Sequence, residues 1–149
     1  MRARLVGAGR AGGSFAAALR VAGWDVDGNL IPVLAAEVPT PANGGVSRDG
    51  KSITWKLKRD VQWHDGKPFT SADVVFNWEY AADPATSAVS IGSYKDVTAT
   101  ALDAYTVRVD YKKASPFWAD PFVGTRGMLI PKHLFDAYKL KRPAHVVIE

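Results

Sequence analysis

The feature that most constrains the fold is a change of hydrophobic period along the middle of the chain. Residues 52–58, SITWKLK, alternate strictly, with Ile53, Trp55 and Leu57 on one side. Successive side chains of a strand point to opposite faces, so this pattern predicts a strand with one buried face. Residues 105–111 alternate in the same way after a stretch of helical spacing. The order of strands, helix, strands and short helix predicts an α+β or mixed α/β fold, with a twisted sheet and a few helices.

A capping box marks the start of the predicted helix. In Thr70-Ser71-Ala72-Asp73, the Thr70 hydroxyl can accept from the amide of the third helical residue, and Asp73 can reach back to the cap. Apolar residues then recur at helical spacing, and the helix should end near Asp83-Pro84. The predicted apolar stripe consists of Val74, Val75, Trp78 and Ala81 or Ala82.

The remaining elements are shorter and are predicted from alternation, turn residues and prolines. Turn chemistry at His64-Asp65-Gly66-Lys67 separates a short companion strand from the capping box. Pro131 suits the first turn of a helix. The predicted elements are strands at 61–63, 94–100, 105–111 and 128–130, a helical turn through 115–118 and a helix over 132–138.

Charge and composition exclude several classes of protein. The chain has nineteen lysines and arginines and fifteen acidic residues. Arg2, Arg4, Arg10 and Arg20 precede every acidic residue, so positive and negative charges are equal in number over the rest of the chain. Nucleic-acid binding needs basic residues gathered on one face, and we therefore expect none. No apolar run reaches the roughly 18 residues of a membrane-spanning helix. The absence of cysteine excludes disulfides and thiolate metal sites.

The first residues carry a glycine pattern of their own. Gly7, Gly9 and Gly12 fit G-x-G-x-x-G, in which glycines let a pyrophosphate approach the backbone. Residues 1–24 therefore resemble the opening of NAD(P)-dependent Rossmann oxidoreductases. Turn residues stand at 27–29, where a second buried strand should follow. We expect these glycines to hold no cofactor, and an oxidoreductase fragment is kept as the alternative.

A secretory signal is another interpretation of the same head. Arg2 and Arg4 would serve as its charged region. Glycines and Arg10 interrupt the stretch that should be continuously apolar, so we do not expect this segment to direct export.

Six segments of the chain resemble those of a known family in sequence and in order. The longest is WHDGKPFTSADVVF at 63–76. The others are GNLIPVLAAE at 28–37, DGKSITWKL at 49–57, DPAT at 83–86, YTVRV at 105–109 and IPKHLF at 130–135. In this order they resemble the extracytoplasmic substrate-binding proteins of peptide- and nickel-type ABC importers, solute-binding protein family 5.

This resemblance implies part of one lobe of a periplasmic-binding-protein-like fold and a non-enzymatic function. It implies capture of an oligopeptide or another small solute, delivery to an ABC permease, and a periplasmic or extracytoplasmic location. Family members are several times longer, so we interpret the chain as a fragment or a chimera that need not be active alone and that can self-associate. The expected divisions are a Rossmann-like head at 1–24, a partial family 5 domain at 25–138 and a basic tail at 139–149.

No catalytic or metal site is expected. His64 and Asp65 stand in a turn, and His133 and His145 follow at no metal-ligand spacing. Ser14, Ser71 and Ser115 lack the G-x-S-x-G context of a nucleophile.

Aromatic residues offer the candidate binding surface. Trp55 and Trp78 fall on apolar faces and are expected in the core. Phe117 and Trp118 follow a proline in a predicted loop, and they are the candidate substrate-binding residues.

Overall fold

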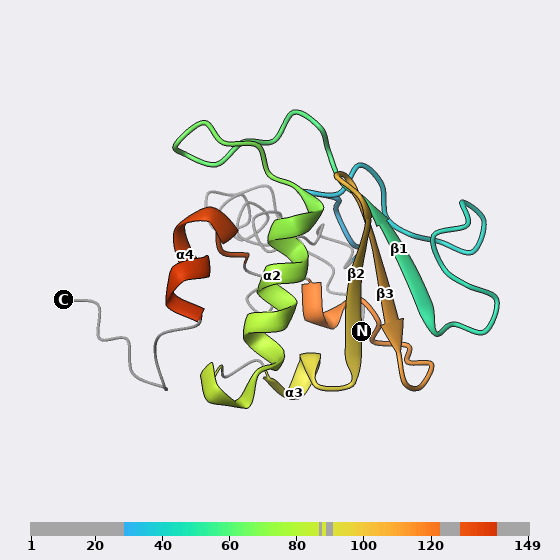
Figure 1. Ribbon diagram of the computed structural model, residues 1–149. Coiled ribbons are helices and arrows are strands. Elements are labelled where there is room, and N and C mark those ends of the chain that lie inside the picture. The colour runs from blue at the N-terminus through green and yellow to red at the C-terminus, as the bar shows by residue number, and fades with distance from the viewer. Residues whose placement is uncertain (1–28, 87, 89–90, 123–128, 140–149) are drawn as a thin grey trace, which may run out of the picture.

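The computed structural model describes residues 29–86, 88, 91–122 and 129–139. Helix α2 (Ser71–Ala82) lies between the sheet on one side and helix α4 (Lys132–Lys139) on the other (Figure 1). The sheet consists of β1 (Ser52–Lys56), β2 (Val97–Asp103) and β3 (Thr106–Tyr111). Three short helical segments complete the elements of the described residues: η1 (Pro84–Thr86), α3 (Ile91–Tyr94) and η2 (Asp120–Phe122). None of the described helices is long and apolar enough to cross a bilayer.

The sheet is antiparallel throughout, in the order β1-β3-β2. Val109 of β3 faces Ile53 of β1 on one side and Ala99 of β2 on the other. All three side chains are buried, as is Val107. The strict alternation of residues 52–58 is therefore confirmed as a strand with one buried face, and the predicted pair of strands after the helix is confirmed as a hairpin.

Helix α2 is buried more widely than its apolar stripe predicted. Val74 joins the buried cluster under the sheet. Phe76, outside the stripe, is also buried, and the Lys132 ammonium lies 5.5 Å from the centre of its ring. Trp78 packs against the core while its indole N–H donates to the Val97 carbonyl at 2.7 Å. The predicted apolar stripe covers too little of the helix, because α4 packs on a second face of α2. Local periodicity cannot predict that contact.

The capping box is present, and the Asp73 carboxylate takes a larger part in it than expected. Its Oδ2 accepts from the Thr70 amide at 2.9 Å, and the Thr70 hydroxyl lies 3.4 Å from the same oxygen. Its Oδ1 accepts from the amide of Lys132, also at 2.9 Å. The side chain is only 4% exposed. One buried carboxylate thus joins the starts of α2 and α4.

Three sequence predictions about strands are wrong, and two of them concern the short strands. Val61 and Trp63 form no companion strand, because only a single bridge joins Gln62 to Pro68 across the predicted turn, where Gly66 has a φ of 81°. Residues 129 and 130 are not in a strand, and residue 128 lies outside the described residues. The helix predicted to follow at 132–138 is confirmed.

Tyr94, predicted to begin a strand, instead ends the short helix α3 and is completely buried. Its ring meets Phe122 edge-on, with 5.6 Å between centroids. Its hydroxyl donates to the Pro121 carbonyl. Burial raises the pKa of Tyr94 to about 12, against a smaller lowering by a hydrogen bond with Asn77.

Replacing Asp73 by alanine should destabilise the protein more than replacing its capping partner. Asp73→Ala removes a charged acceptor from two partly buried amides and should lower the free energy of unfolding by about 2–3 kcal/mol. Thr70→Ala should cost about 1 kcal/mol. Urea unfolding followed by tryptophan fluorescence measures both, with the exposed Asp60→Ala as the control. Equal losses for the first two variants would show that the contact with α4 contributes nothing.

Tyr94 should also make stability depend on pH in the alkaline range. Its pKa is higher in the folded protein, so the stabilisation is complete below the ordinary value of about 10 and declines as the pH rises towards 12. Absorbance of tyrosinate should show a late step that disappears in Tyr94→Phe. A titration of the folded protein that lacks such a step would contradict the burial of this hydroxyl.

Candidate ligand-binding groove

A cavity of about 360 Å³ lies at the base of the β2–β3 hairpin, where β2 begins and β3 ends. We call it the hairpin groove. Its apolar wall is formed by Val97, Tyr111, Phe117 and Pro121. Its polar lining residues are Ser93, Asp96, Lys112, Lys113 and Ser115. The volume is at the lower end of the range for small-molecule sites.

Two tyrosine hydroxyls fix the segment that closes the groove. The Tyr111 hydroxyl donates to the carbonyl of Trp118, and the Tyr94 hydroxyl donates to that of Pro121. The Ser115 hydroxyl oxygen accepts from the Phe117 amide at 3.1 Å. Residues 115–122 are therefore tied both to the end of β3 and to α3. A buried tyrosine hydroxyl needs such a partner, and here the partner is the backbone beside the groove.

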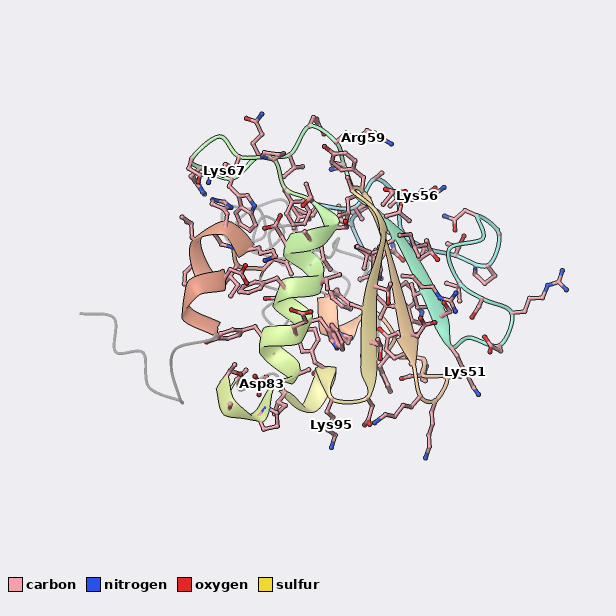
Figure 2. The ribbon with its side chains drawn as sticks, viewed as in Figure 1. Lys51, Lys56, Arg59, Lys67, Asp83 and Lys95 are labelled. Atoms are coloured by element: carbon pink, nitrogen blue, oxygen red, sulfur yellow. The ribbon has the colours of Figure 1, made fainter. Side chains whose placement is uncertain are left out.

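The rim of the groove is cationic. The Lys112 ammonium pairs with the Asp96 carboxylate at 2.8 Å, with both side chains well exposed. The hydrogen bond from Lys112 holds the pKa of Asp96 below its ordinary value, and the charges of Lys95 and Lys113 act in the same direction. Figure 2 shows Lys95 pointing away from the fold at this end of the sheet. One ammonium group thus pairs directly with the carboxylate, and two further positive charges act on it.

The structure separates the two candidate substrate-binding residues. Phe117 lines the groove and is 69% exposed. Trp118 is half-buried and packs on Trp55, with 5.6 Å between ring centroids. A ligand role for either residue stays a prediction. Trp55 and Trp78 both pack against the core cluster, as the sequence predicted.

His64 and Asp65 lie in a turn, as expected, but one contact was missed. Asp65 Oδ1 accepts from the Lys67 amide at 3.1 Å, which is the local bonding expected of a turn. Asp65 Oδ2 also lies 2.6 Å from His133 Nε2, although 68 residues separate the two in the chain. This hydrogen bond is the main cause of a lowered pKa for Asp65. No spacing in the sequence predicts this pairing, because His133 reaches Asp65 only through the packing of α4 in the folded chain.

The other polar candidates are placed as follows. Ser71 Oγ donates to the Asp103 carbonyl at 2.5 Å and links α2 to the hairpin. The described part of the chain contains no group of three or more His, Cys, Asp or Glu side chains that could hold a metal. The candidates that lie outside the described residues are Gly7, Gly9, Gly12, Ser14 and His145.

Comparisons with known proteins agree on one family. Residues 29–147 match the bacterial extracellular solute-binding proteins, family 5. The periplasmic oligopeptide-binding protein OppA of Escherichia coli is 24% identical over 144 residues, covering 83% of this chain and 25% of the relative. A Brucella ovis protein, named as an ABC transporter peptide-binding protein, is 33% identical over 89 residues, covering 59% of this chain and 16% of the relative.

A solved structure extends the likeness to three dimensions. NikZ from Campylobacter jejuni, crystallised with Ni(L-His), superposes with a TM-score of 0.68 and 27% identity, over 80% of this chain and 22% of that one. The described fold is accordingly part of an α+β lobe of the periplasmic-binding-protein type. The chain spans about a quarter or less of the length of these relatives. It belongs to family 5 of the bacterial extracellular solute-binding proteins.

Proposed function

We propose that this chain is part of a solute-binding component of an ABC importer, that it takes an oligopeptide-type solute, and that it catalyses no reaction. The observation that carries the proposal is the family match over residues 29–147, together with peptide-binding relatives. Its partners would be the peptide and an ABC permease, and its location periplasmic or extracytoplasmic. The divisions at 1–24, 25–138 and 139–149 belong to the same proposal.

Phe117 is the proposed contact with the solute. An aromatic ring offers a large apolar area at a small cost in conformational entropy. Phe117 stands at the edge of the hairpin groove, while the backbone of its segment is held by Ser115 and by the two tyrosine hydroxyls. An apolar peptide side chain would lie against this ring and the wall that Tyr111 and Pro121 form.

Peptide binding should be weak and should depend on Phe117. The groove is open on one side, so we expect a Kd of about 1 mM, equivalent to about −4 kcal/mol. Titration of the labelled chain with a tripeptide that carries one phenylalanine should shift the amide resonances of residues 115–118. Phe117→Ala should reduce the affinity at least about fivefold, through loss of roughly 1–2 kcal/mol of apolar contact.

The matched control is Leu102→Ala, which truncates another exposed apolar side chain, 56% exposed, on the same hairpin. This variant should bind as the unaltered chain does. If the peptide shifts only amide resonances outside residues 115–118, Phe117 is not the contact. Equal losses of affinity in Phe117→Ala and Leu102→Ala would lead to the same conclusion. The absence of any peptide-dependent shift would remove peptide binding by this chain altogether.

We also propose self-association through α4. Leu134 is 53% exposed on this helix, and Phe135 beside it is partly exposed. Exposed apolar area of this kind favours contact with another apolar surface.

Sedimentation velocity over a range of concentrations tests this proposal. We expect reversible dimers, and Leu134→Glu should raise the dimer dissociation constant at least about tenfold, because a buried leucine contributes roughly 1.5–3 kcal/mol. Leu102→Glu is the control for added charge. A chain that stays monomeric at all concentrations would contradict the proposal.

A further inference from the structure

We propose that the hairpin groove recognises a carboxylate adjacent to an apolar side chain, as at the C-terminal end of a peptide. The inference rests on the proposed function and names the part of the peptide that this groove takes. It is carried by the juxtaposition, within one cavity, of an apolar wall and a cationic rim.

The charge balance of the rim favours an anion. Asp96 is already paired with Lys112 at 2.8 Å, so their charges largely cancel. Among the ion pairs of the described residues, none involves Lys113 or Lys95. Both lie close enough to Asp96 for their charges to favour its ionised form. Of these two lysines only Lys113 lines the cavity, so its ammonium group remains for a ligand anion there.

A hydroxyl group adds a directional donor. The Ser115 oxygen accepts from the Phe117 amide at 3.1 Å, and this bond uses one of its lone pairs. The hydroxyl hydrogen remains available, because a serine hydroxyl combines one donor with two acceptor positions. Ser115 lines the cavity together with Lys113. A carboxylate entering beside Phe117 would thus meet an ammonium group and a neutral donor.

The apolar wall decides between kinds of anion. Val97, Tyr111, Phe117 and Pro121 line the same cavity as Lys113. A small inorganic anion would leave the exposed ring of Phe117 in contact with water, and a neutral peptide would leave the Lys113 ammonium group without a partner. A ligand that carries both a carboxylate and an apolar side chain satisfies both parts of the cavity.

The experiment compares three tripeptides that differ in whether, and where, they carry a carboxylate. The first is Ala-Ala-Phe with a free C-terminus, the second is its C-terminal amide, and the third is Ala-Glu-Phe amide. Amide shifts of residues 115–118 are followed at low salt and at 0.5 M NaCl. Because exposed charge pairs are weak, we expect the free acid to bind roughly fivefold more tightly than the amide. High salt should remove this difference.

Two charge variants locate the effect. Lys113→Gln should abolish the preference for the free acid without changing the affinity for the amide. Lys67→Gln removes the same charge at the opposite end of the molecule (Figure 2) and should leave the preference intact. Recovery of the tighter binding by Ala-Glu-Phe amide would show that any carboxylate serves. Failure to recover it would assign the preference to the C-terminus, and both results support carboxylate recognition.

Three outcomes overturn the inference, and they are distinguishable. Equal affinity for the free acid and the amide would refute carboxylate recognition and leave peptide binding in place. Carboxylate recognition at this groove is equally refuted if Lys67→Gln abolishes the preference as fully as Lys113→Gln does. If none of the three peptides shifts residues 115–118, peptide binding at this groove fails, and the inference fails with it.

Discussion

The buried face of β3 is the contact on which the rest of the described structure depends. β3 pairs with β1 on one side and β2 on the other, and its Val107 and Val109 are completely buried. Helix α2 packs on this side of the sheet through Val74. The two ends of the hairpin are positioned by this central strand. At one end Ser71 binds the Asp103 carbonyl, and at the other Tyr111 begins the wall of the groove.

The groove shows how core packing can produce a binding surface. Tyr94 is buried and Tyr111 half-buried, yet the hydroxyl of each donates to a carbonyl of the segment that closes the cavity. Trp118 contributes its ring to the core, against Trp55, and its carbonyl to Tyr111. With its neighbour held at both ring and backbone, Phe117 is turned outwards. An exposed aromatic on a fixed backbone loses little conformational freedom when it meets a ligand.

Sequence reasoning recovered the elements whose signals are local. Strand β1, the capping box, the hairpin and the start of α4 follow from alternation, spacing and proline position over a few residues. It failed for the short strands predicted at 61–63 and 128–130, and it failed where distant segments decide the structure. Asp73 binds Lys132 across 59 residues, and Asp65 meets His133 across 68.

The candidate site, too, could be predicted only in part from local sequence. Phe117 and Trp118 are adjacent and equally aromatic, so only the packing of Trp55 distinguishes the exposed side chain from the half-buried one. Tyr94 was misassigned because a four-residue helix is too short to show a helical period. The two hydroxyl contacts that close the groove could not be predicted either. They join α3 and β3 to a segment whose sequence has no regular spacing.

Because the hairpin groove is open to water, it can select ligands only in certain ways. A site that binds small molecules tightly usually buries 70–90% of the ligand, and water keeps access to a cavity bounded by well-exposed lysines. Exposed charges in water add little to affinity, but they orient a charged ligand and raise its rate of encounter. The apolar wall can bind apolar side chains of different shapes, because hydrophobic contact is not directional. Under the proposed function, this arrangement would orient one end of the solute, and most of the binding free energy would come from additional contacts.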